Sequence, residues 1–155
     1  MSLERDIEYL ADVPILQDFG DEQLRLIAFG SERREIERGT RLFDAGERAD
    51  CGYLVTSGEI VLGDGTHRTK EHCGPGTLIG ERAILMETVR PARAIASRDS
   101  SVIQIRRVLF HRILNEYPDV AAKLQVRLKR RITDLVDEMG KIRPLLSKDR
   151  PKNYR

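Results

Sequence analysis

The chain has 155 residues, enough for one domain with a substantial core and too few for two ordinary domains. Hydrophobic residues make up 40% and charged residues 34%, which is typical of a globular protein, and a net charge of +2 gives no electrostatic case for nucleic-acid binding. The charged N-terminus lacks an apolar signal core, and no apolar run approaches the roughly 18 residues of a membrane span. We therefore expect a cytoplasmic protein without a membrane segment, whose two cysteines, Cys51 and Cys73, are free thiols.

The first predicted elements are helices within residues 4–30. Pro14 interrupts an apolar cluster in this region, because proline cannot continue the interior of a helix. A second helix is predicted to begin with Asp21 as its cap, and Leu24 and Ile27 form its apolar side.

Residues 35–106 have a different character, with glycines recurring between short segments of alternating apolarity. Residues 53–55 and 60–62 flank the turn-forming segment 56–59, a pattern that predicts a hairpin. Alanines at 92, 94 and 96 alternate with other residues, and a further strand is predicted over residues 102–105. Many short strands at close spacing predict a mainly β fold, a small barrel or jelly roll, flanked by helices.

Residues 107–142 are predicted to be helical again, with a restart at Pro118, which suits a first helical turn. The helix over residues 119–142 carries a narrow apolar stripe at steps of three and four: Val120, Leu124, Leu128, Ile132, Leu135, Met139 and Ile142. Packing on its own barrel is one interpretation of the stripe. Because the stripe continues past what a small barrel covers, we favour a homodimer contact.

The same helix carries the basic run 127–131, which we interpret as its solvated face, with a nucleic-acid patch as the less favoured alternative. Residues 143–155 are predicted to be a polar, frayed tail. The domain boundaries expected from the sequence are therefore 1–142 for one domain and 143–155 for the tail.

The most informative segment for function is residues 80–90, GERAILMETVR, which combines a short helical turn with an acid and an arginine. The N-terminus of a helical turn attracts anions, and Gly80 allows its backbone to approach a ligand closely. Arg90 offers a planar, permanently charged fork for phosphate oxygens, whereas Glu81 is suited to accept sugar hydroxyls. An anion beside vicinal hydroxyls describes a ribose phosphate, so the segment predicts a small nucleotide pocket. On spacing alone, a surface salt bridge between Glu81 and Arg90 is the alternative.

Five segments resemble motifs of the cyclic-nucleotide-binding domain family, in the order and with the gaps of that family, over about residues 8–140. The family includes catabolite-activator-like bacterial regulators, kinase regulatory subunits and gated channels. The five segments are residues 13–24, similar to the family's opening helix "VPLF…L…EEL"; 38–47, similar to "G-x-x-L-F-x-x-G-E/D"; 53–60, similar to "Y-x-I-x-x-G-x-V"; 76–83, similar to "G-x-x-F-G-E-L-A"; and 90–96, similar to "R-S/T-A-T-V-x-A".

The resemblance implies a double-stranded β-helix jelly roll followed by a long C-terminal helix, with a phosphate-binding cassette at residues 80–94. It implies that Glu81 accepts the ribose 2′-hydroxyl, that Arg90 pairs with the cyclic phosphate, and that the N–H groups of residues 81–83 complete the anion cradle. Arg93 is a competitor for the phosphate role, but alternation along a strand places Arg90 and Ala92 on one face and Arg93 on the other. The candidate ligand-binding residues are Gly80, Glu81, Arg82, Ala83, Arg90, Pro91 and Ala92.

The sequence departs from the family pattern at two positions of the cassette. Arg82 stands where the family has an aliphatic residue, and Pro91 stands where many members carry a hydroxyl residue that contacts the ligand. In the bacterial activators a base-contacting hydroxyl lies at the position that Leu135 occupies here, and neither Leu135 nor Val136 can hydrogen-bond a base. Cyclic AMP is therefore favoured over cyclic GMP only as the commoner bacterial ligand of the family.

The bacterial activators continue into a helix-turn-helix domain, whereas this chain ends at Arg155, shortly after its long helix. We therefore expect no direct DNA binding. A stand-alone sensor that acts through partners, among them a protein partner, is favoured over a fragment of a longer chain.

The function implied is a non-catalytic regulatory module that binds a cyclic nucleotide and signals through its C-terminal helix. The alternative is a dimerisation or docking module of the same fold that has lost or exchanged its ligand. A metal-dependent enzyme is disfavoured, since His67, His72 and Cys73 are interpreted as surface residues of a polar hairpin rather than as metal ligands. Two cysteines are too few for a cluster held by cysteines alone.

Overall fold

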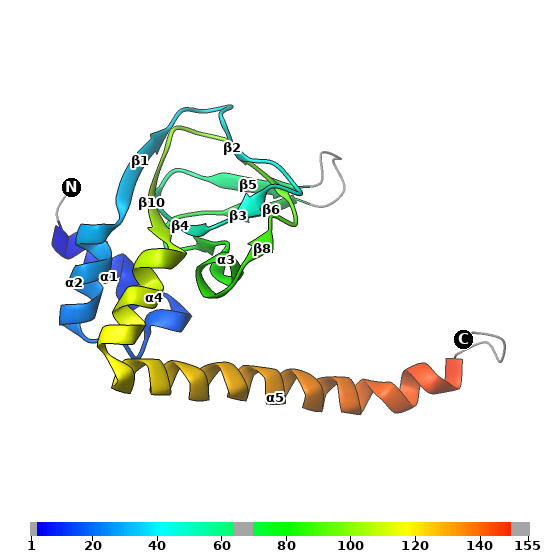
Figure 1. The fold of residues 1–155 in the computed structure, drawn as a ribbon. Helices are drawn as coiled ribbons and strands as arrows, with labels where there is room; N and C mark the ends of the chain where they lie inside the picture. Colours follow the sequence, from blue (N-terminus) through cyan, green and yellow to red (C-terminus); the bar gives the residue numbers. More distant parts are fainter. Residues whose placement is uncertain (1–2, 64–69, 150–155) are drawn as a thin grey trace.

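The computed structural model describes residues 3–63 and 70–149, with side-chain detail as far as residue 137. A β body is flanked by helices at both ends of the chain (Figure 1). The leading helices are α1 (Leu3–Ala11), the short 3₁₀ helix η1 (Pro14–Leu16) and α2 (Asp21–Gly30). The trailing helices are α4 (Arg107–Glu116) and the long α5 (Pro118–Asp149). Among the described residues, no helix combines the length and apolarity needed to cross a membrane.

Two four-stranded antiparallel sheets form the body. The first has the order β1 (Glu32–Ile36), β10 (Ser100–Arg106), β4 (Cys51–Ser57) and β7 (Leu78–Ile79). The second has the order β2 (Arg41–Phe43), β9 (Arg93–Ala96), β5 (Ile60–Gly63) and β6 (Lys70–Cys73). A small ribbon pairs β3 (Arg48–Ala49) with β8 (Thr88–Val89), and the short helix α3 (Glu81–Leu85) precedes β8. The predicted mainly β jelly roll with flanking helices is confirmed.

The hairpin predicted around residues 56–59 is wrong. The strands on either side of this turn, β4 and β5, lie in different sheets, so the turn carries the chain from one sheet to the other. Gly58 adopts a φ of +80°, and a Cβ built there would lie 2.4 Å from the carbonyl oxygen of Asp99. Only glycine fits this crowded, left-handed position. Residues 56–59 do form a turn, but a local sequence pattern does not indicate which sheet the next strand joins.

Two helix boundaries also differ from the prediction. Gly20, not Asp21, caps α2, and its N–H donates to Oε1 of Gln23 at 2.8 Å. Asp21 is instead the first helical residue, where its charge suits the helix dipole. At the other end, α5 continues past residue 142 to Asp149, and the rest of the predicted tail, 150–155, lies outside the described residues.

The apolar side chains form two clusters, and α3 belongs to one of them. One cluster lies between the flanking helices and the first sheet, where Phe110 of α4 stacks on Phe19 with ring centroids 5.6 Å apart. Ile84 of α3 is part of this cluster and is 1% exposed. The second cluster fills the interior between the two sheets. The helical core therefore fixes the position of α3 against the barrel.

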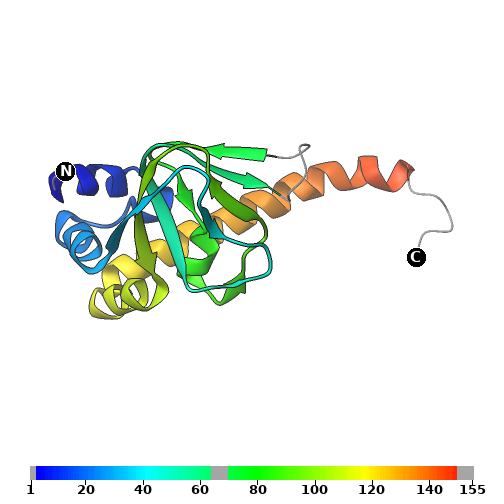
Figure 2. The ribbon, with the colours of Figure 1, turned by 90° about the horizontal axis from the view of Figure 1, so that it is seen from above.

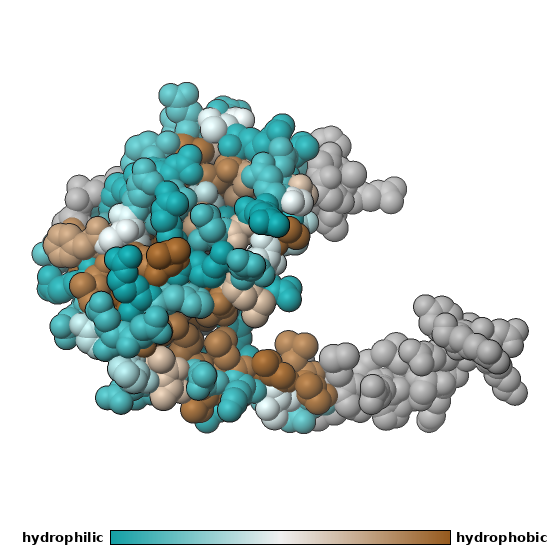
Figure 3. All heavy atoms as spheres, in the orientation of Figure 1, coloured by the Kyte–Doolittle hydropathy of each residue, from teal (hydrophilic) through white to brown (hydrophobic). Residues whose placement is uncertain are grey.

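The apolar stripe of α5 divides into a covered and an uncovered part. Val120 and Leu124 are buried, and Leu128 is packed against the helical core. Ile132 and Leu135 are 64% and 61% exposed. Figures 1 and 2 show α5 running past the barrel and projecting from the body, and Figure 3 shows apolar side chains on this part of the helix. The stripe residues Met139 and Ile142 lie beyond the described side chains.

Both cysteines are free thiols, as expected, and both are buried; Cys73 provides a test of the fold. Burial raises the pKa of its thiol from the ordinary 9.0 to about 11, with the charges of Glu71 and Glu59 adding to the effect. The unfolded chain then loses this proton at lower pH than the folded protein. We therefore expect the free energy of unfolding, measured by urea titration, to fall as the pH rises from 9 to 11. Cys73→Ala should show a shallower decline; identical slopes would contradict the assignment.

Candidate functional site

The residues predicted from the cassette line one cavity of about 220 Å³ between α3, β8 and the start of β9. Its walls also include apolar side chains of the second sheet and of the small ribbon. The seven predicted site residues all line it: Gly80, Glu81, Arg82, Ala83, Arg90, Pro91 and Ala92. Residues that are twelve positions apart in the sequence (80 to 92) thus meet around one cavity.

Gly80 occupies the turn that begins α3, and two features require glycine there. Its φ is +81°, a left-handed conformation that side chains disfavour. A Cβ built on Gly80 would lie only 2.4 Å from Nη1 of Arg90. The missing side chain therefore allows the arginine to pack against the backbone at the entrance to α3.

Arg90 is 5% exposed and is held by the protein on one side of its guanidinium group. Nη2 donates to the carbonyl oxygen of Cys51 at 2.8 Å and to its Sγ at 3.3 Å. Cζ lies 4.3 Å from the centroid of the Phe43 ring and 5.5 Å from that of Tyr53. These contacts fix the planar fork beside the cavity, and no carboxylate pairs with it in the part of the chain that the structure describes.

Arg93, the competitor for the phosphate role, points to the surface. Its Nε donates to Oδ1 of Asp44 at 2.9 Å, and the side chain is 42% exposed. The predicted division between Arg90 on the inside and Arg93 on the outside is therefore confirmed. Arg93 and Arg41 together lower the pKa of Asp44, against the opposing effect of desolvation.

Glu81 pairs with an arginine, but not with Arg90. Nη1 of Arg131, on α5, donates to Oε1 of Glu81 at 2.5 Å, and the Glu81 side chain is 28% exposed. The predicted alternative, a salt bridge between Glu81 and Arg90, is wrong. Glu81 also lines the cavity, and a carboxylate that accepts one hydrogen bond can accept others.

The backbone donors at the start of α3 are fewer than the resemblance implied. The N–H of Ala83 donates to the carbonyl oxygen of Gly80 at 3.0 Å, so this group is committed to the turn. Among the described residues, the N–H groups of Glu81 and Arg82 have no backbone acceptor, as expected for the first turn of a helix. An anion at this end of α3 would meet two free N–H groups rather than three.

The two positions that depart from the family pattern lie at the rim of the cavity. Arg82 and Pro91 are both exposed. Arg82 therefore places a positive charge at the mouth of the cavity and not at its floor. Proline at 91 supplies no N–H and no hydroxyl, so the polar groups of the site come from α3, Thr88 of β8 and Arg90.

Sequence reasoning missed two arginines that hold the site together. Nη1 of Arg107, the first residue of α4, lies 3.1, 3.2 and 3.0 Å from the carbonyl oxygens of Ala49, Ala83 and Met86, and so ties β3 and the middle and C-terminal end of α3 to α4. Arg131 belongs to the run that was predicted to be a solvated face. The sequence carries no signal for the role of Arg131, because its partner Glu81 lies fifty positions away in the chain.

No arrangement resembling a metal centre is found within residues 3–63 and 70–149. His72 is exposed and lies 3.2 Å from a carboxylate oxygen of Glu59, as expected for a surface residue. Cys73, predicted at the surface, is 1% exposed instead, because its side chain points into the interior between the sheets. His67 lies outside the described residues.

The structure is a jelly-roll domain with a cavity at the start of α3, and comparison with known proteins identifies its family. The model of the Cyclic nucleotide-binding domain matches residues 33–117, and the chain belongs to this family. It is 39% identical to a cyclic nucleotide-binding-like protein from Brucella abortus, whose structure superposes with a TM-score of 0.66 over 71% of this chain and 97% of that chain.

Two curated relatives are larger proteins. The chain is 30% identical over 125 residues to the Cyclic AMP receptor protein of Thermus thermophilus, which is 78% of this chain and 58% of that protein. It is 29% identical over 116 residues to Lysophospholipase NTE1 of Chaetomium globosum, which is 72% of this chain. The chain spans 8% of the length of the fungal lysophospholipases that it matches.

Proposed function

We propose that this chain is a non-catalytic regulatory module that binds a cyclic nucleotide in the cavity between α3 and Arg90. The observation that carries the proposal is that three kinds of group surround a cavity of about 220 Å³: the buried Arg90 guanidinium, two N–H groups at the start of α3 and the Glu81 carboxylate. Among the described residues, the guanidinium has no carboxylate partner and the N–H groups have no backbone acceptor. The guanidinium and the N–H groups suit a phosphate, and the carboxylate suits a ribose 2′-hydroxyl. Membership of the cyclic nucleotide-binding family supports the same ligand class.

Cyclic AMP is the nucleotide that we favour over cyclic GMP. The Thermus relative is named a cyclic AMP receptor protein, and this name supports the preference for cyclic AMP. The residues at the predicted base-contact position, Leu135 and Val136, offer no hydrogen-bonding group. The preference therefore rests on the relative and not on a base contact in this chain.

Calorimetric titration with cyclic AMP and cyclic GMP, with 5′-AMP as the control, tests the proposal. We expect micromolar or tighter binding of a cyclic nucleotide and no comparable heat with 5′-AMP. Thermal unfolding should then shift upward with ligand concentration, because a ligand that binds only the folded state stabilises it. No heat and no thermal shift at millimolar ligand would exclude cyclic nucleotides.

The internal contacts of Arg90 favour one second candidate, a docking or dimerisation module that has lost its ligand. Arg90 donates to Cys51 and lies over two aromatic rings, so it also has a structural role in the barrel. These contacts of Arg90 do not need a bound ligand, and neither does the proline at position 91. The titration above separates the two candidates.

We further propose that the chain forms a homodimer through α5 and that the ligand signals through this helix. The exposed part of the stripe, at Ile132 and Leu135, supports the contact. We propose a cytoplasmic setting, supported by the two free thiols, and no direct DNA binding.

Leu135→Asp is expected to convert the dimer to a monomer, because it places a charge in the apolar seam. Leu135 is 61% exposed, so the fold should not change. The mass in solution, from light scattering coupled to size-exclusion chromatography, measures the effect. Val108→Asp, at a residue of α4 that is 69% exposed, is the matched control and should leave the mass unchanged. A monomeric wild type, or an unchanged mass in Leu135→Asp, would contradict the dimer.

A further inference from the structure

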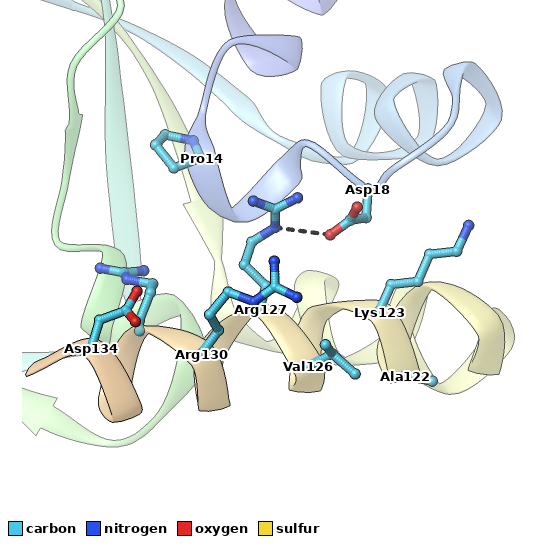
Figure 4. Close-up of a pocket in the computed structure, with 9 residues that line it drawn as sticks. Pro14, Asp18, Ala122, Lys123, Val126, Arg127, Arg130 and Asp134 are labelled. Atoms are coloured by element: carbon cyan, nitrogen blue, oxygen red, sulfur yellow. Dashed lines mark hydrogen bonds and ion pairs between the residues drawn. The ribbon is translucent and has the colours of Figure 1, made fainter. Parts of the chain in front are cut away.

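A second and larger cavity lies outside the cassette, between α5 and the segment that joins α1 to α2. This groove has a volume of about 470 Å³. Pro14 and Asp18 form one wall, and the side chains of α5 form the other (Figure 4). Lys123, Val126 and Arg130 recur at helical spacing and therefore stand on one face of α5 along the groove.

The groove carries more positive charge than its own acids neutralise. Nε of Arg127 donates to Oδ2 of Asp18 at 2.8 Å, and this contact lowers the pKa of Asp18. Arg131 is engaged by Glu81. Lys123 and Arg130 are both exposed and form no salt bridge among the described residues, although the charge of Lys123 adds to the lowering of the Asp18 pKa. Among the described residues, two cations without a salt bridge, seven positions apart, are therefore left along one groove, against one such carboxylate, Asp134.

The groove also contains apolar surface between these cations. Val126 is 58% exposed and lies between Lys123 and Arg130 on the helix face. Pro14, also exposed, faces the groove from the opposite wall. A purely ionic ligand would leave this surface uncovered. An acidic segment with one apolar side chain would match both the charges and the surface between them.

We propose that this groove is the docking surface for an acidic segment of a partner protein, whose carboxylates pair with Lys123 and Arg130 and whose apolar side chain covers Val126. Nucleic acid fits less well, because Asp18 and Asp134 line the same groove and would oppose a continuous phosphate backbone. The chain as a whole carries a net charge of only +2, which agrees with a local rather than a general attraction for acids.

Fluorescence anisotropy with a labelled peptide of alternating glutamate and leucine tests the proposal on the whole chain without nucleotide. We expect saturable binding that weakens as salt rises, because exposed charges are screened. Lys123→Glu combined with Arg130→Glu should lower the affinity by roughly tenfold or more, since attraction becomes repulsion at both ends of the groove. Val126→Asp should lower it independently.

The matched control is Arg25→Glu combined with Arg98→Glu, which changes the net charge equally at exposed arginines outside the groove. This control should bind the peptide as the wild type does, and circular dichroism checks that all variants fold. Equal loss in both double variants, no peptide binding by the wild type, or groove-dependent binding of a duplex oligonucleotide instead would each overturn the proposal. None of these results depends on nucleotide binding.

Discussion

Arg90→Ala should weaken the binding of a cyclic nucleotide by roughly 10- to 150-fold, because a charge-assisted contact to phosphate is worth about 1.5–3 kcal/mol. The structure supports a value at the upper end of this range. Arg90 is 5% exposed and is already fixed by Cys51 and by the ring of Phe43, so little ordering is needed when a phosphate arrives. Calorimetric titration with cyclic AMP, compared with the wild type, measures the loss.

The control for this prediction is Arg93→Ala. Arg93 pairs with Asp44 at the surface, so its removal should change the affinity far less. Because Arg90 is also part of the barrel interior, thermal unfolding of Arg90→Ala separates a lost contact from a lost fold. A larger effect at Arg93 than at Arg90 would contradict the assignment of the phosphate ligand.

Phe110→Ala should have the largest effect on stability. The side chain is fully buried and stacks on Phe19 between the helices and the first sheet. Removing a buried phenylalanine costs about 3–5 kcal/mol, since apolar contacts are lost and a cavity remains. For a chain of this size, that corresponds to a fall in the melting temperature of roughly 6–20 °C. Thermal unfolding followed by circular dichroism measures it.

Phe29→Ala provides the matched control, because the same chemical change is made at a residue of α2 that is 74% exposed. Its effect on stability should stay within about 0.5 kcal/mol. Similar losses of stability in Phe110→Ala and Phe29→Ala would mean that the cluster of side chains around Phe110 is not part of the core of the domain.

Much of the fold and of the cavity lining followed from local patterns in the sequence. Gly80, Glu81 and Arg90 were predicted to surround one site, and all three line the same cavity. This prediction succeeded because a left-handed glycine, a short helical turn and a strand that alternates in and out are all encoded over a few residues. Their ligand and their individual roles remain predictions.

The failures came from contacts between residues far apart in the chain. Gly58 marks a turn, but whether β5 pairs with β4 or with β9 depends on strands that come later. Arg131 pairs with Glu81 across fifty positions, which no local pattern encodes. The Ala83 N–H was predicted to bind an anion, whereas Gly80 takes it within the turn itself.

The contact between Glu81 and Arg131 stands where α5 leaves the body, since the next stripe residues, Ile132 and Leu135, are exposed. From residue 131 to Asp149 the helix extends about 27 Å at 1.5 Å per residue. The ion pair therefore lies near the point about which the projecting part of α5 would rotate. A small displacement of the Glu81 carboxylate, too small to disturb the barrel, would swing the far end of α5 through a much larger arc.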